Sequence, residues 1–451
     1  MDRDDERIAP EEILRVPWSG SARPVPRLIL QPLQTFLRTE EASGILLLAA
    51  AVTALVWANS PWRSAYDALW HTQLTIGLGD WSLAQDLQHW VNDALMALFF
   101  LVVGLEIKRE LTTGELREPT AAALPAIAAL GGMIVPALLY LAINRSGEPA
   151  RGWGTPMATD IAFALGVLAL VGRGVPTALK SFLLALAIVD DIGAILVIAV
   201  FYSGSISPGP LLAAGGLLAL ILILQRLQVR WAAVYVLLGV GVWLATFKSG
   251  VHATIAGVAL GLATPAVPFQ RPRAVSLEAH RVADHTVDDP QPPDADAHHW
   301  LHLADLTREA VSPLARLEHL LHPWTSWVVI PVFALANAGV SISSSSLGDA
   351  LTSGVTLGIV AGLVVGKTVG VTVFTWLATR TGITRLPEGV GWSQLVGVAT
   401  LAGIGFTVSL FITSLAFQTQ AVQDAAKVGI LAASLLAGLL GALFLARSRH
   451  R

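Results

Sequence analysis

The sequence contains no cysteine and few charged residues, and each shortage excludes classes of protein. Without cysteine there is no disulfide, no thiolate metal site and no cysteine nucleophile. Charged residues make up 14% of the 451-residue chain and hydrophobic residues 54%, whereas an average soluble protein has about 25% charged residues. A chain this apolar cannot cover its own surface in water. The composition therefore excludes a soluble enzyme, a nucleic-acid-binding protein and a disordered protein.

Long apolar runs separate the polar segments, and we interpret them as transmembrane helices in an all-α polytopic membrane protein. A helix that crosses a bilayer needs about 17–25 residues. These runs are continuous, unlike the alternating ten-residue segments of a membrane β-barrel. The sequence predicts twelve spans, at 42–59, 88–107, 121–143, 155–171, 177–201, 209–225, 231–247, 252–265, 323–340, 355–378, 393–417 and 427–446.

The basic residues favour one orientation of these spans. With twelve spans both termini lie on the same side, and the tails and loops of that side carry 23 of the 29 Lys and Arg residues. The opposite loops carry five, and Lys367 lies inside the tenth span. We therefore expect both termini to be cytoplasmic.

The polar segments divide the chain further. Residues 1–41 form an N-terminal tail that has no apolar core, so it is not a secretory signal, and we expect it to be disordered. Residues 72–83 surround a Gly-Leu-Gly-Asp turn and predict a small external β-hairpin. The C-terminal tail is residues 448–451.

A cytoplasmic insertion at 266–316 separates two membrane parts, 42–265 and 317–447. It is rich in Pro, Asp and His, which is typical of a flexible, solvated linker. The alternative is that His298, His299 and His302 bind a metal or a regulator.

Charged side chains inside apolar spans point to a functional site, because each costs about 2.5–3.5 kcal/mol near the bilayer centre. Each could be a structural ion pair. Adjacent carboxylates are harder to explain in this way, since both cannot ionise cheaply in a low dielectric without a cation or a base nearby. The charged positions are Asp93 in span two, Asp160 after Thr159 in span four, Asp190 and Asp191 in span five, and Lys367 in span ten.

Asp190 and Asp191 predict a site at which protons and a hard cation compete. Neighbours on a helix point about 100° apart, so both can border one cavity, and carboxylate oxygens are the ligands that a hard cation prefers. If the site opens alternately to the two membrane faces, competition exchanges cation for proton without covalent chemistry or a cofactor. We therefore expect a transporter and not an enzyme. Lys367 could neutralise one carboxylate, lose its proton when a cation arrives, or compensate backbone dipoles.

Two spans have matched interruptions. Thr159 and Asp160 interrupt span four, and Gly403-Ile404-Gly405 interrupts span eleven. Each is the middle member of a three-span group, and the basic residues give the two groups opposite orientations. This pattern indicates two inverted three-helix repeats whose broken helices cross at the membrane midplane. Asp160 suits the positive helix ends at such a crossing, and Lys367 the negative ones.

These stretches closely resemble the NhaA family of sodium/proton antiporters. The resemblance runs in family order over about residues 40–447. The matching stretches include WVNDALMALFFLVVGLEIKREL (90–111), ATDIAFALGVLAL (158–170), LALAIVDDIGA (184–194), KSGVHATIAGV (248–258), LEHLLHPW (317–324), GLVVGKTVG (362–370) and GIGFTVSLFITSLAF (403–417).

The resemblance implies an electrogenic, pH-regulated exchange of internal Na⁺ or Li⁺ for external H⁺, by alternating access. It implies a bacterial inner-membrane homodimer joined partly through the hairpin 72–83. Asp190 and Asp191 match the cation- and proton-binding pair, Thr159 and Asp160 the crossing, and Lys367 the essential lysine. Asp93 matches a further membrane carboxylate. Residues that match those linked to pH regulation are Glu106, Arg109, Glu110, His252, Glu318, His319 and His322. The insertion lies just before this last group and departs from the compact family pattern.

Two other classes remain as alternatives. An intramembrane aspartyl protease also needs two membrane carboxylates, and Gly77-Leu78-Gly79-Asp80 fits its GxGD pattern. That tetrapeptide, however, lies in the polar hairpin and not in an apolar span. A cation channel usually has rings of charges or carbonyls built by oligomeric symmetry, whereas these charges lie on separate helices of one chain.

Overall fold

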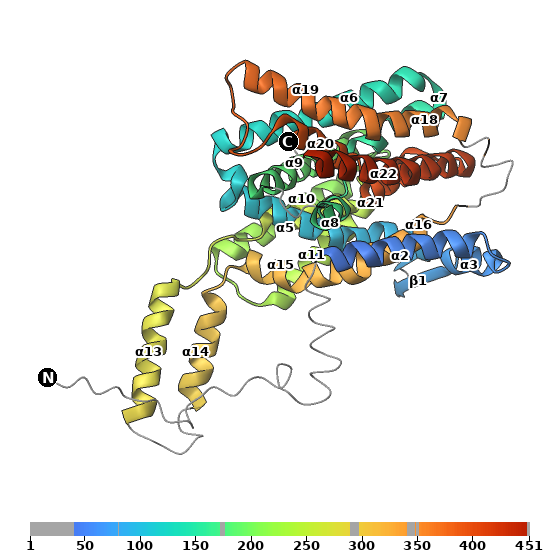
Figure 1. Ribbon diagram of the computed structural model, residues 1–451. Helices are drawn as coiled ribbons and strands as arrows, with labels where there is room; N and C mark the ends of the chain where they lie inside the picture. The colour runs from blue at the N-terminus through green and yellow to red at the C-terminus, as the bar shows by residue number, and fades with distance from the viewer. Residues whose placement is uncertain are drawn as a thin grey trace, which may run out of the picture.

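The computed structural model describes residues 40–79, 81–171, 176–288, 297–340, 348 and 351–448. Over these residues the fold is almost wholly helical, with one two-stranded sheet (Figure 1). Seven helical segments are long and apolar enough to cross a membrane, or up to ten if each bent pair is one span. Two more apolar helices, Ala232–Lys248 and Thr254–Ala263, are shorter. The chain is thus a polytopic membrane protein, and the count of twelve spans stays a prediction.

The elements follow one another along the chain with short connections. They are α2 (Glu40–Ala58), α3 (Arg63–Trp70), β1 (Gln73–Leu78), β2 (Trp81–Asp86), α4 (Leu87–Trp90), η4 (Val91–Leu95), α5 (Met96–Thr112), η5 (Glu115–Arg117), α6 (Pro119–Ile143), α7 (Gly147–Ala150), η6 (Arg151–Met157), α8 (Ile161–Val171), α9 (Thr177–Phe201), α10 (Pro208–Arg226), α11 (Ala232–Lys248), α12 (Thr254–Ala263), α13 (Pro272–Asp288), α14 (Ala297–Glu309), α15 (Pro313–Trp324), η7 (Thr325–Val329), α16 (Ile330–Asn337), α18 (Gly354–Val360), η8 (Ala361–Gly366), α19 (Lys367–Arg380), α20 (Trp392–Leu401), α21 (Phe406–Ala416) and α22 (Gln420–Ser448).

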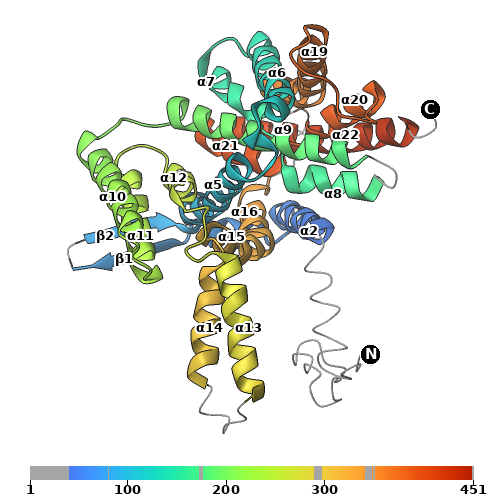
Figure 2. The ribbon, with the colours of Figure 1, turned by 90° about the vertical axis from the view of Figure 1, so that its left-hand side faces the viewer.

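The long helices run side by side in one bundle (Figure 1). Helices α13 and α14 leave the bundle at one end, which we call the α13 end, and β1 and α3 lie at the opposite end. Figure 2 views the bundle from the α13 end, with α10 and α11 on one side and α6 and α19 on another.

Glycines allow two pairs of helices to pack backbone to backbone. A Cβ atom on Gly257 of α12 would lie 2.1 Å from the carbonyl oxygen of Ala97 in α5, and one on Gly370 of α19 would lie 2.1 Å from that of Gly131 in α6. Small residues at such contacts are typical of membrane helices, whose association depends on close packing. These contacts bring α5, which carries Arg109, and α19, which begins with Lys367, close to their neighbours.

The predicted β-hairpin is present. Strands β1 and β2 pair in antiparallel register from Gln73–Asp86 to Leu78–Trp81, and the turn includes Gly79 at a φ of 61°. The indole of Trp90 donates to the carbonyl of Leu74 at 2.9 Å and ties the sheet to the helix that follows. The position of the hairpin outside the cell and its role in a dimer stay predictions.

The structure corrects the expectation of a flexible insertion. Helices α13 and α14 pack side by side outside the bundle (Figure 2), with residues 289–296 between them lying outside the described residues. Val275 and Val282 are spaced seven apart on α13 and are buried with Leu303 of α14 in a small separate core. The low average hydropathy of the segment concealed this amphipathic pairing. Residues 1–39 of the predicted tail and 449–451 also lie outside the described residues.

Candidate functional site

Both interruptions predicted from the sequence are breaks in helices. The chain bends by 48° between η6 and α8, and by 46° between α20 and α21. The two breaks lie against each other, because the amide of Asp160 donates to the carbonyl of Ile404 at 2.6 Å. Thr and Asp favour such breaks, since their side chains compete for backbone hydrogen bonds inside a helix and satisfy free amides at a helix start.

Asp160 satisfies the starts of two helices at once. Its Oδ1 atom accepts from the amide of Phe163 at 3.1 Å, in the first turn of α8. Its Oδ2 atom accepts from the amide and the hydroxyl of Thr407, at 3.1 and 2.6 Å, in the first turn of α21. Helix starts carry partial positive charge. The structure thus brings Asp160 to the positive helix ends that the sequence predicted for it.

Lys367 and Asp190 form a fully buried ion pair beside the breaks. The ammonium nitrogen lies 2.5 Å from Asp190 Oδ2, and both side chains are 0% exposed. Lys367 also donates to the carbonyl of Met157, where η6 ends. Of the three roles left open for Lys367, its contacts fit charge neutralisation and compensation of backbone dipoles.

Thr159 links the ion pair to the second break. Its hydroxyl oxygen lies 2.7 Å from Asp190 Oδ2 and 2.8 Å from the carbonyl of Ala402. A hydroxyl has one hydrogen, so it donates to only one of these acceptors at a time. A change at Asp190 can therefore transfer this hydrogen bond to the backbone of the α20–α21 break.

Asp191 differs from its neighbour because it lacks a bound countercharge. Its side chain is buried, and its Oδ1 atom has no hydrogen-bond partner among the described residues. The Oδ1 atom of Asp190 is also buried and unpartnered in this part of the chain. Glu106, Asp160 and Lys367 are close enough to Asp191 to interact with it electrostatically. Two buried carboxylate oxygens without donors are a suitable arrangement for a proton or a hard cation.

A π-helical turn, which the sequence analysis missed, positions Lys367. The turn η8 ends at Gly366, directly before Lys367. A Cβ on Gly366 would lie 2.8 Å from Pro136 Cα, and one on Gly362 would lie 2.7 Å from Pro156 Cβ. The wider turn and the two glycines let the helix approach η6 closely enough for Lys367 to reach Met157. Single π-helical turns occur often at functional sites, and the glycine spacing was the available signal.

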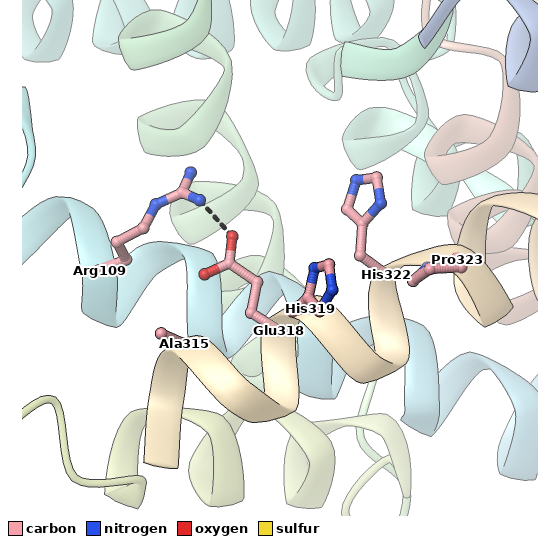
Figure 3. Close-up of a pocket in the computed structure, with 6 residues that line it drawn as sticks. All are labelled: Arg109, Ala315, Glu318, His319, His322 and Pro323. Atoms are coloured by element: carbon pink, nitrogen blue, oxygen red, sulfur yellow. Dashed lines mark hydrogen bonds and ion pairs between the residues drawn. The ribbon is translucent and has the colours of Figure 1, made fainter. Parts of the chain in front are cut away.

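Most of the residues matched to pH regulation gather at the α13 end of the bundle. Arg109 of α5 donates to Glu318 of α15 and lies 3.6 Å from Glu110. Figure 3 shows His319 and His322 on the same helix as Glu318, lining one pocket with Arg109. The structure also corrects the predicted start of span nine at 323. The helical segment Pro313–Asn337 is continuous, so Glu318 and both histidines lie on the spanning segment itself.

His252 lies apart from this pocket and faces Asp93. Its Nε2 atom is 3.8 Å from Asp93 Oδ1, and its Nδ1 atom is 3.0 Å from the hydroxyl of Thr254. The ring packs edge-on against Phe411 of α21, with 5.2 Å between centroids. The sequence gave no reason to pair Asp93 with His252, because their spans are far apart in the chain.

A family model described as Na⁺/H⁺ antiporter 1 matches residues 34–445. The chain belongs to this family. The Na(+)/H(+) antiporter NhaA of Oleidesulfovibrio alaskensis is 50% identical over 94% of this chain and 95% of that protein. The Na(+)/H(+) antiporter NhaA 2 of Sorangium cellulosum is 48% identical over 93% of this chain and 90% of its own length. The resemblance found in the motifs is thus confirmed, and this NhaA-family protein is a transporter and not an enzyme.

Membership of the NhaA family removes the protease alternative, and Asp80 of its GxGD pattern lies outside the described residues. The alternative metal site also gains no support. His298, His299 and His302 are exposed on α14. Within the described residues, no group of three or more His, Asp or Glu side chains is arranged to hold a metal ion.

Proposed function

We propose that this protein exchanges cytoplasmic Na⁺ or Li⁺ for external H⁺ across the bacterial inner membrane. The observation that carries the proposal is the buried Asp190–Lys367 ion pair next to Asp191, at the contact of two broken helices. Membership of the antiporter family supports this exchange.

Cation and proton compete for the same carboxylates in this scheme. A cation that enters beside Asp190 and Asp191 is repelled by the ammonium of Lys367, and it replaces that ammonium as the countercharge. If Lys367 and Asp191 each release a proton as the cation binds, two protons move for one cation and the exchange is electrogenic. The unpartnered Oδ1 atoms of both aspartates support their role as cation ligands.

Alternating access requires the site to open to each side in turn. We infer twelve spans with cytoplasmic termini and two inverted three-helix repeats, each with one of the observed breaks in its middle helix. Asp160 ties the starts of α8 and α21 together, so the two half-helices would move as one unit. Thr159 would report the state of Asp190 to the α20–α21 break through its shared hydrogen.

The remaining parts concern regulation and assembly. We infer that the Arg109–Glu318 pocket, with Glu110, His319 and His322, adjusts activity to cytoplasmic pH, and that the Asp93–His252 pair contributes to the pH response. We also infer a homodimer that forms partly through the hairpin β1–β2, because both strands have an unpaired edge in this two-stranded sheet.

Everted vesicles from an antiporter-deficient strain test the exchange. With an acid interior and a pH-sensitive dye, pulses of Na⁺ or Li⁺ should release protons, and K⁺ should not. Asp190→Asn and Asp191→Asn should abolish this release, whereas Asp67→Asn on α3, half-exposed at 53%, should leave it unchanged.

Two outcomes would reject the proposal. One is the absence of proton release between pH 6 and 9 from a folded, membrane-inserted protein. The other is Na⁺ flux that follows the electrical gradient without proton movement, which would favour the channel alternative.

A further inference from the structure

Helices α13 and α14 are closed at their base by contacts between the two ends of the segment. The amide of Gln270 donates to the carbonyl of Glu309 at 3.1 Å, and the side-chain amide of Gln270 donates to the Glu309 carboxylate at 3.2 Å. The pair projects across the direction of the bundle helices (Figures 1 and 2). Its only polar link to a distant part of the chain, among the bonds of the described residues, starts at this base.

That link is an ion pair between Glu309 and Arg230. The guanidinium of Arg230 donates to the carboxylate of Glu309, whose side chain is 21% exposed. Arg230 also lies over the ring of Phe269, 5.2 Å from its centroid. Arg230 belongs to the turn between α10 and α11, so the ion pair connects that turn to the base of the α13–α14 pair.

The base leads directly into α15. Three residues after Glu309, the hydroxyl of Ser312 accepts from the amide of Ala315 and caps the helix start. The amide of Leu314 donates to the carbonyl of Pro265 at 3.1 Å, and the Leu314 side chain is buried. Helix α15 is therefore held at two points by charge, by Glu309 just before its start and by Glu318 in its middle.

The two ion pairs act on the same rigid helix from different neighbours. Arg109 holds Glu318 to α5, and Arg230 holds Glu309 to the α10–α11 turn. Because a helix transmits a displacement along its axis, the position of its first turn sets how the Glu318 side chain meets α5. The charged and titratable groups on the elements packed here are Glu106, Lys108, Arg109 and Glu110 on α5, Arg316, Glu318, His319 and His322 on α15, and Arg230, Arg271, Asp305 and Arg308 around the base.

We propose that Glu309 is a positioning residue for the pocket at the α13 end: its ion pair with Arg230 fixes the start of α15 and thereby sets the pH dependence of exchange. This proposal rests on the proposed function, in which that pocket regulates activity. It assigns a role to the base of a segment that the sequence indicated only as a linker.

The test is the pH profile of exchange in proteoliposomes for Glu309→Gln and Arg230→Gln. Glutamine keeps the shape of Glu309 and its ability to accept from Gln270, so only the ion pair is lost. An exposed or half-exposed ion pair of this kind contributes up to about 1 kcal/mol, so we expect the pH of half-maximal activity to shift by about half a unit. The maximal rate should stay within about twofold of the unmodified protein, because neither residue contacts the Asp190 site.

Two further variants separate this role from a general loss of structure. Arg281→Gln removes the ion pair with Glu278, 2.7 Å apart on α13 of the same segment, and should leave the pH profile unchanged. The exchange of charges in Arg230→Glu with Glu309→Arg should restore the original profile. Hydrogen exchange of the α15 amides should be faster in Glu309→Gln and unchanged in Arg281→Gln.

An unchanged pH profile in Glu309→Gln would overturn the proposal, as would an equal shift in Arg281→Gln. Failure of the proposed function looks different, because the unmodified protein would then show no exchange at any pH. An unmodified protein that exchanges equally at every pH would reject regulation by the pocket while leaving the exchange itself intact.

Discussion

The hydroxyl of Thr407 provides a sharp test of the contact between the two breaks. Thr407→Val keeps the shape of the side chain and removes the 2.6 Å hydrogen bond to Asp160. Hydrogen bonds to charged groups contribute about 1.5–3 kcal/mol, whereas side-chain bonds between membrane helices average about 0.6 kcal/mol and reach about 1.7. Asp160 keeps the amides of Phe163 and Thr407. We therefore expect a loss of about 1.5 kcal/mol in the free energy of unfolding, near the upper membrane value.

The same helix offers a matched control. Thr413 also lies on α21 and is fully buried, but its hydroxyl has no hydrogen-bond partner among the described residues. Thr413→Val removes an unsatisfied polar group, so it should leave stability unchanged or raise it. Unfolding in detergent, followed by tryptophan fluorescence, compares the two variants, and vesicle assays compare their exchange rates. Equal stability of the two variants would refute the assignment of Asp160 as the group that joins α8 and α21.

Three other changes test separate parts of the structure. Lys367→Met should abolish exchange and lower stability by about 3–5 kcal/mol, because it leaves a buried carboxylate without its countercharge; the double variant with Asp190→Asn should recover stability and not exchange, as measured by detergent unfolding and the vesicle assay. Gly257→Ala should destabilise the α5–α12 contact by about 1–3 kcal/mol, since the new methyl group meets the Ala97 carbonyl, whereas Gly216→Ala in the open space beside α10 should be neutral or stabilising in the same unfolding measurement. Glu318→Gln should shift the pH profile of exchange more than Glu309→Gln does, because it removes the direct partner of Arg109; an equal or smaller shift would contradict the order of the two ion pairs.

The sequence indicated the central groups because charge is so rare in the spans. Asp160, Asp190, Asp191 and Lys367 could be identified by their cost in lipid alone, and the Thr-Asp and Gly-Ile-Gly stretches indicated where helices break. The pairing of Lys367 with Asp190 and not with Asp191 could not be predicted. It depends on the π-helical turn η8, which rotates the residues after it by a fraction of a turn.

Helices α13 and α14 escaped prediction for a different reason. Their polar composition resembles that of a linker, and the apolar positions at Val275, Val282 and Leu303 are too few to raise the average hydropathy. The ion pair Arg230–Glu309 joins residues 79 apart in sequence. A single sequence gives no signal for such a contact, because surface Arg and Glu residues are common.

The charge balance at the two breaks explains why one carboxylate is left for the transported ions. Asp160 offsets the positive starts of α8 and α21, and Lys367 offsets both Asp190 and the carbonyl at the end of η6. These contacts compensate the broken helices within the protein. Asp191 remains buried without a bound countercharge of its own, and its charge can be balanced only by a proton, by a cation, or by Lys367 leaving Asp190. Each of these three events changes the hydrogen bonds around the breaks, so ion binding at Asp191 is linked to the contact between the half-helices.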